Sequence, residues 1–140
     1  GVNQSELERQ AHQSGITSQI HFLGYQSDYP TVQAWIHHAS ACVVPYKDNL
    51  VNRCRCAAKL AEYMAIGKTV IASAIGQNKE YIQHGHNGFL VRPGSVSQWA
   101  SEIESSIFSP EPEMGMHAKR RVQEQYSWSI VARVLLKVLS

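Results

Sequence analysis

The sequence has little charge of either sign, few cysteines and no long apolar run. Its 140 residues include 13 Lys or Arg and 11 Asp or Glu, so the formal net charge is only +2. A charge this small argues against a nucleic-acid-binding protein, because such proteins usually carry a strongly basic face. No uncharged apolar run approaches the roughly 18 residues that a membrane-spanning helix needs. Residues 1–19 also lack the apolar centre of a signal peptide.

The three cysteines exclude a disulfide scaffold, because their number is odd and small. They are consistent with a reducing compartment, which favours the cytoplasm. A zinc site usually takes four ligands, with two to four residues between paired cysteines. Cys54 and Cys56 are separated by one residue, and no His is near them in sequence. We therefore predict no metal site.

Short apolar runs alternate with segments of helical periodicity. The predicted strands are residues 20–23, 41–44, 70–72 and 89–91, and the predicted helices are residues 5–14, 30–40, 57–66, 78–83, 97–108, 111–125 and 128–139. Residues 47–55 are polar and are predicted as a loop. This alternation is typical of β-α units and predicts an α/β fold, with a Rossmann-like parallel sheet flanked by helices. Ligands bind such sheets beyond the carboxyl ends of the strands.

The chain begins with a predicted helix, whereas a fold of this kind normally begins with a strand. Gly1 also stands where an initiator Met is usual. We therefore expect residues 1–140 to be a fragment that is truncated at the N-terminus, with further strands upstream.

The most informative segment is residues 43–73, which combine a strand, a polar loop, a helix and a second strand. Backbone amides at a helix start carry partial positive charge and can hold an anion. Arg53 and Arg55 lie beside this start, and a guanidinium can bind two phosphate oxygens at once. Lys59 and Glu62 lie on one helix face, where a carboxylate could accept hydrogen bonds from ribose hydroxyls. These residues suit a nucleoside diphosphate, although a solvated loop and a surface ion pair are alternatives.

The motif K-L-A-E-Y-M-A-I-G-K at residues 59–68 resembles the pattern K-L-x-E-Y-M-A-x-G-K. This pattern belongs to the C-terminal, donor-binding domain of group 1 (family four) glycosyltransferases, which have the GT-B fold. Other short motifs follow in the family's order: F-L-G at 22–24, V-P at 44–45, part of G-G-x-x-E at 76–80, G-x-N-G-x-L-V at 85–91 and Y-S-W at 126–128. The resemblance implies one half of a GT-B enzyme, without its acceptor-binding N-terminal domain.

The resemblance also implies roles for matching residues. Glu62 corresponds to the glutamate that binds the ribose hydroxyls of the nucleotide sugar, and backbone amides around Cys56 and Ala57 hold the diphosphate. The loop containing Gly24 and Tyr25 packs against the base. The implied reaction retains the anomeric configuration and usually needs no metal. The nucleotide sugar is a substrate, so no cofactor is expected.

The chain departs from the family pattern at several positions. The family often has a second glutamate eight positions before the first, where this chain has Cys54. The stretch between Pro45 and Glu62 is longer than in that pattern, so either the carboxylate is lost or Asp48 supplies it as a candidate catalytic group. Gln77 stands at the second glycine of G-G-x-x-E.

These features predict the donor domain of a retaining hexosyl- or N-acetylhexosaminyltransferase that uses a nucleotide sugar, expected to be UDP-linked. The expected acceptor is a saccharide or lipid-linked glycan in bacterial surface polysaccharide synthesis, of the O-antigen, lipopolysaccharide or capsule type. The expected partners are the acceptor domain and the cytoplasmic face of the inner membrane, and the chain alone should transfer little or no sugar. Two alternatives stay open: a non-catalytic nucleotide-sugar-binding or regulatory domain, and a sugar-nucleotide 2-epimerase domain.

The C-terminal helix carries an apolar stripe formed by Trp128, Val131, Leu135, Val138 and Leu139. This stripe either packs onto the present domain or crosses to the other domain of the family's fold. The second interpretation predicts that part of the stripe is exposed here.

Overall fold

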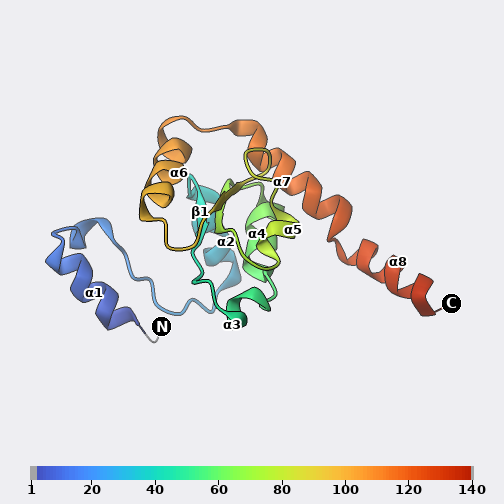
Figure 1. Cartoon of the computed structure of the whole chain (residues 1–140), viewed down its shortest axis with the longest axis horizontal. Helices are drawn as coiled ribbons and strands as arrows, with labels where there is room; N and C mark the ends of the chain where they lie inside the picture. The colour runs from blue at the N-terminus through green and yellow to red at the C-terminus, as the bar shows by residue number, and fades with distance from the viewer. Residues whose placement is uncertain (1–2, 140) are drawn as a thin grey trace. The chain divides into compact units, whose positions relative to one another are not determined.

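The structure is a computed structural model that describes residues 3–139. The chain divides into two compact units, Gly1–Ala34 and Trp35–Ser140. The first unit contains helix α1 (Gln4–Gln13), the short 3-10 helix η1 (Thr17–Gln19) and the beginning of helix α2 (Tyr29–His38). The second unit contains the sheet and the remaining helices (Figure 1).

The predicted strand at residues 20–23 is wrong, because these residues form no regular element. Ile20, Phe22 and Leu23 are all at least 36% exposed. An isolated extended segment is stable only when neighbouring strands pair with it. Within residues 3–139, no strand pairs with this segment.

The sheet contains three parallel strands in the order β1-β2-β3, which are Cys42–Val44, Val70–Ser73 and Phe89–Val91. Val43 of β1 is in register with Ile71 of β2, and Ala72 of β2 is in register with Leu90 of β3. Every residue of the central strand β2 is buried, as a strand covered on both faces requires. The predicted parallel α/β fold is confirmed.

The helices of the second unit begin and end within a few residues of their predicted bounds, with one addition. They are α4 (Ala58–Ile66), α5 (Asn78–Tyr81), α6 (Val96–Phe108), α7 (Pro112–Gln125) and α8 (Trp128–Leu139). The addition is α3 (Leu50–Arg53), which forms within the predicted loop at residues 47–55. Asn49 caps α3, since its side chain accepts a hydrogen bond from the Asn52 N–H.

The core lies between the sheet, α4 and α7. Leu60 and Met64 of α4 are fully buried, one turn apart on the same face. They belong to one apolar cluster with Val70 of β2 and with Ala118 and Val122 of α7. This packing fixes the position of α4, and therefore of its first turn, against the carboxyl end of the sheet.

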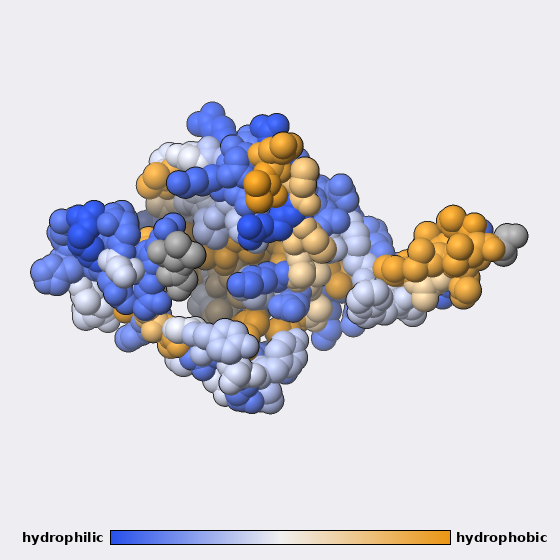
Figure 2. All heavy atoms as spheres, turned by 90° about the horizontal axis from the view of Figure 1, so that it is seen from below, coloured by the Kyte–Doolittle hydropathy of each residue, from blue (hydrophilic) through white to orange (hydrophobic). Residues whose placement is uncertain are grey.

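The apolar stripe of α8 is exposed. Trp128, Val138 and Leu139 are 87%, 78% and 82% exposed, and Figure 2 shows the apolar side chains of this helix gathered on the surface. The interpretation that the stripe packs onto this domain is therefore wrong. None of the helices within residues 3–139 has both the length and the apolar character needed to cross a bilayer.

Candidate functional site at the start of α4

The loops that follow β1 and β2 are joined at the carboxyl end of the sheet by buried polar side chains. The hydroxyl of Ser73 accepts a hydrogen bond from the Tyr46 N–H at 2.8 Å and donates one to the Tyr46 carbonyl at 2.9 Å. The amide of Asn78 donates to the Ser73 carbonyl at 2.9 Å. Ser73 and Asn78 are 1% and 3% exposed, so this polar network fixes the geometry of both loops.

The loop after β2 also packs against the end of α3 and the residue before α4. Gly76 has a φ of +44°, and a Cβ atom at this position would lie 2.4 Å from the Arg53 carbonyl oxygen. Only glycine avoids both the strained conformation and this clash. The neighbouring Gln77 accepts a hydrogen bond through its Oε1 from the Ala57 N–H at 3.0 Å. Gln77, which stands at the second glycine of the pattern G-G-x-x-E, therefore reaches the start of α4 with its side chain.

These segments enclose an open depression at the start of α4, which we call the α4 depression. Its volume is about 450 Å³. It is lined by Arg53, Cys54, Arg55, Cys56, Gly76, Gln77 and Glu80. The structure thus brings together three residues predicted for the site, Arg53, Arg55 and Cys56, with the loop that follows β2.

Arg53 is paired with Asp48. Its Nε and Nη2 atoms donate to the two carboxylate oxygens at 2.5 and 3.0 Å. This pairing holds the pKa of Asp48 below its ordinary value. Arg53, predicted to bind phosphate, therefore already holds an anion, and Asp48 is an ionised partner of arginine.

Within the described residues 3–139, the other predicted cations, Arg55 and Lys59, form no salt bridge with a carboxylate. The guanidinium carbon of Arg55 lies 5.1 Å from the ring centroid of Tyr46, in a cation–π contact. Lys59 and Glu62 are exposed on α4. The alternative interpretation of these two side chains as a surface ion pair is wrong, since the salt bridges formed within residues 3–139 do not include it.

Gly24 and Tyr25 belong to the first unit. Gly24 has a φ of +66°, which makes a turn after Leu23. Tyr25 is 92% exposed, so its ring is open to a binding partner.

Helix α7 fixes the far side of the α4 depression through Glu80. The Glu80 carbonyl accepts hydrogen bonds from Arg121 Nη2 at 2.6 Å and from the Tyr126 hydroxyl at 3.0 Å. The ring of Tyr126 also stacks on Tyr81, with 4.1 Å between centroids. Sequence reasoning missed these contacts, because the partners are more than 40 residues apart.

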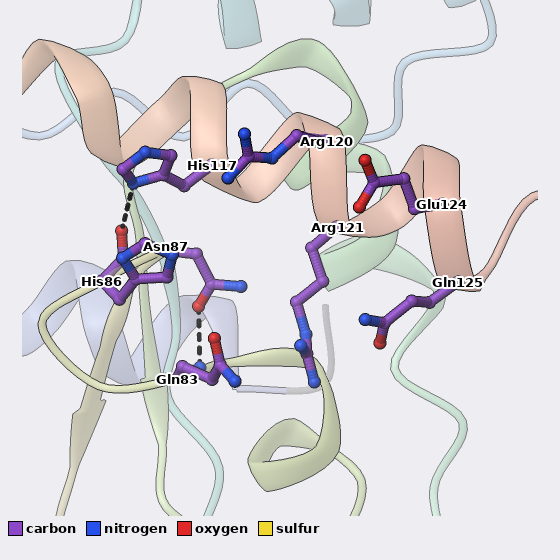
Figure 3. A pocket seen from close by; sticks show the side chains of 8 residues that line it. All are labelled: Gln83, His86, Asn87, His117, Arg120, Arg121, Glu124 and Gln125. Atoms are coloured by element: carbon purple, nitrogen blue, oxygen red, sulfur yellow. Dashed lines mark hydrogen bonds between the residues drawn. The ribbon is translucent and has the colours of Figure 1, made fainter.

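A second hollow, which we call the α7 pocket, lies beside the turn that leads into β3 (Figure 3). Its volume is about 240 Å³, and it is lined by Gln83, His86, Asn87, His117, Arg120, Arg121, Glu124 and Gln125. The rings of His86 and His117 stack with 4.2 Å between centroids. Because this turn precedes β3, the α7 pocket lies at the amino end of that strand.

Within residues 3–139, no three His, Cys, Asp or Glu side chains lie close enough together to hold a metal ion. Cys54 and Cys56 are both exposed free thiols.

The chain is a parallel α/β domain with an open depression near the carboxyl end of its sheet. The family described as glycosyl transferases group 1 matches residues 1–107, and the chain belongs to this family. The predicted resemblance to the C-terminal half of GT-B glycosyltransferases is thereby confirmed.

Three relatives illustrate the similarity. An uncharacterized glycosyltransferase of Methanocaldococcus jannaschii is 28% identical over 136 residues, which are 94% of this chain and 33% of the relative. Sucrose-phosphate synthase of Thermosynechococcus elongatus is 26% identical, with a TM-score of 0.80 over 99% of this chain and 34% of that one. Anabaena HepE, crystallised with UDP, is 23% identical, with a TM-score of 0.78 over 96% of this chain and 36% of HepE. The chain spans about a third of each.

Proposed function

We propose that this chain binds the nucleotide-sugar donor of a glycosyltransferase, and that the donor is a UDP-sugar. The observation that carries the proposal is the α4 depression, which opens onto a helix start at the carboxyl end of a parallel sheet. Membership of the glycosyl transferases group 1 family supports it. So do the structures of the fold relative HepE with UDP and with UDP-glucose.

Each part of the donor has a proposed partner. The amides around Cys56 and Ala57 donate to the diphosphate, and Arg55 and Lys59 add positive charge. Arg53, which is paired with Asp48, adds positive charge when it binds Asp48 and a phosphate at the same time. Glu62, exposed one turn into α4, accepts hydrogen bonds from the ribose hydroxyls.

The base has its own partners in this proposal. The turn at Gly24 and the exposed ring of Tyr25 provide an apolar surface for it. Aromatic rings stack on nucleobases through their faces.

The proposed reaction belongs to a longer enzyme. It transfers a hexosyl or N-acetylhexosaminyl group, with retention, to a saccharide or lipid-linked acceptor in bacterial surface polysaccharide synthesis, of the lipopolysaccharide or capsule type. The acceptor is held by an N-terminal domain, and the reaction takes place at the cytoplasmic face of the membrane. Because the acceptor must be positioned against the donor, this chain alone transfers little or no sugar.

One observation favours a second function, a non-catalytic nucleotide-sugar-binding domain. The chain has Cys54 where the family often has a glutamate, and the nearby Asp48 is held by Arg53. A carboxylate bound in this way is a weak base, because its pKa is lowered. Supplying the N-terminal domain of a related enzyme and measuring sugar transfer separates the two functions.

Titration calorimetry with UDP and GDP tests donor binding directly. We expect saturable binding of UDP and a loss of about tenfold or more in affinity for Glu62→Ala, since hydrogen bonds to a charged group are removed. Glu104→Ala, an exposed glutamate of α6, is the matched control and should bind UDP like the unmodified chain. Absence of binding at millimolar nucleotide, or equal affinities for both variants, would contradict the proposal.

A further inference from the structure

Helix α4 begins without a capping side chain of its own. Its N-cap residue is Ala57, which has no side-chain acceptor, and Ala57 is only 3% exposed. A buried amide without an acceptor is costly. Gln77, in the loop after β2, provides the acceptor: its Oε1 accepts a hydrogen bond from the Ala57 N–H at 3.0 Å.

This contact depends on a residue that departs from the family pattern. Gln77 stands where the pattern G-G-x-x-E has its second glycine, and a glycine has no side chain that could reach α4. The side chain of Gln77 also lines the α4 depression, together with Arg55 and Cys56. Gln77 therefore accepts a hydrogen bond from a backbone amide to which the donor diphosphate is proposed to bind.

We propose that Gln77 competes with the donor diphosphate for the first amide of α4 and thereby lowers donor affinity. This inference rests on the proposed function. A phosphate oxygen is a stronger acceptor than a neutral amide oxygen, so the donor displaces Gln77. The displaced side chain is half-buried at the rim of an open depression, so it can turn into water.

The cost of displacement is one neutral hydrogen bond. Removing the competitor should therefore tighten donor binding by about three- to tenfold. The same change leaves the buried Ala57 amide without an acceptor until the donor arrives. The variant should be less stable than the unmodified chain when empty, yet more strongly stabilised by UDP.

The experiment is a titration of the 140-residue chain and four variants with UDP and with inorganic pyrophosphate, paired with thermal unfolding. Gln77→Ala removes the competing acceptor, and Gln77→Asn keeps the amide on a chain that is one methylene shorter. Gln77→Glu places a carboxylate there that repels the diphosphate. Gln123→Ala, an exposed glutamine of α7, is the control.

We expect the dissociation constant for UDP to rise in the order Gln77→Ala, unmodified chain, Gln77→Glu. Gln77→Asn should resemble Gln77→Ala, and Gln123→Ala should match the unmodified chain. If the unmodified chain binds UDP and both Gln77→Ala and Gln77→Asn bind it equally well or more weakly, the inference about Gln77 is overturned. The proposed function would still stand. No binding of UDP or pyrophosphate by any of these proteins would overturn the proposed function, and this inference with it.

Discussion

The α4 depression and the α7 pocket are both basic, yet they are built differently. The α4 depression opens where a helix begins, after the carboxyl ends of two strands, and Arg53 and Arg55 line it. The α7 pocket lies before β3 and is lined by Arg120, Arg121 and two histidines. Each hollow is lined by two arginines and one glutamate, Glu80 in the α4 depression and Glu124 in the α7 pocket, so formal charge does not distinguish them as anion sites.

The two hollows differ in the backbone groups that they offer, because some polar side chains in each already have partners. In the α7 pocket, Asn87 accepts the Gln83 N–H and donates to the Tyr81 carbonyl, and Arg121 donates to the Glu80 carbonyl. These groups hold the turn and α5 in place. The α4 depression instead combines cations with the first amides of a nine-residue helix. We therefore propose that helix-start amides beyond the strands, more than charge, mark the nucleotide site.

The largest effect should come from filling the space at Gly76. Gly76→Ala places a Cβ atom 2.4 Å from the Arg53 carbonyl at a positive φ, so we expect about 3 kcal/mol of lost stability together with lost UDP binding. Gly94→Ala is the control, because its φ is also positive but nothing lies within 4 Å of the added atom. It should cost about 1 kcal/mol. Urea unfolding measures both, and equal losses would show that the contact at Gly76 is unimportant.

Replacing one arginine in each hollow tests the comparison itself. Arg55→Ala should weaken UDP binding by about tenfold, since a charged contact to phosphate is lost. Arg120→Ala, in the α7 pocket, should leave the dissociation constant unchanged. Calorimetry at two salt concentrations measures both variants, and a larger loss for Arg120→Ala would reverse our assignment of the two hollows.

Much of this arrangement follows from local sequence. The three strands were predictable because each contains a continuous apolar run, and α4 was predictable because Leu60 and Met64 repeat at helical spacing. The strand expected at residues 20–23 fails because a strand depends on a distant partner, which no local pattern reveals. Of the residues that line the α4 depression, Arg53 and Arg55 were predicted from their position before α4, and Cys56 from the family resemblance.

The contacts that shape the α4 depression were not predictable. The bond from Gln77 to Ala57 spans 20 residues of sequence, and the bonds of Ser73 to Tyr46 span 27. Both arise only when parallel strands bring their following loops together. A departure from the family pattern at Gln77 was the one local sign.

A moderate effect is expected where α7 supports the α4 depression. Tyr126→Phe removes the hydrogen bond to the Glu80 carbonyl and should lower the free energy of unfolding by about 1 kcal/mol. UDP affinity should change little, because Arg121 still holds the same carbonyl. Tyr29→Phe, which is 57% exposed, should leave stability unchanged. Equal unfolding midpoints for the two variants would contradict the supporting role of α7.

The smallest effect concerns the pairing of Asp48 with Arg53. The pairing lowers the pKa of Asp48 in the folded chain. The pair therefore contributes to the free energy of unfolding at pH values above the ordinary pKa of 3.8. The contribution is lost as the pH falls through the lowered pKa. NMR titration of the Asp48 carboxyl should show the lowered pKa, and Arg53→Gln should return it to its ordinary value. An unchanged titration in Arg53→Gln would show that the pair does not persist in solution.

The most direct test of the donor site is an NMR titration of the isotope-labelled chain with UDP. The amide signals of residues 54–59 and 76–77 should shift progressively and saturate, since we propose that UDP displaces Gln77 and binds the start of α4. The amides of residues 83–88 and 117–125, around the α7 pocket, should keep their positions. Shifts concentrated in the α7 pocket, or no shifts at millimolar UDP, would contradict the assignment of the donor site to the α4 depression.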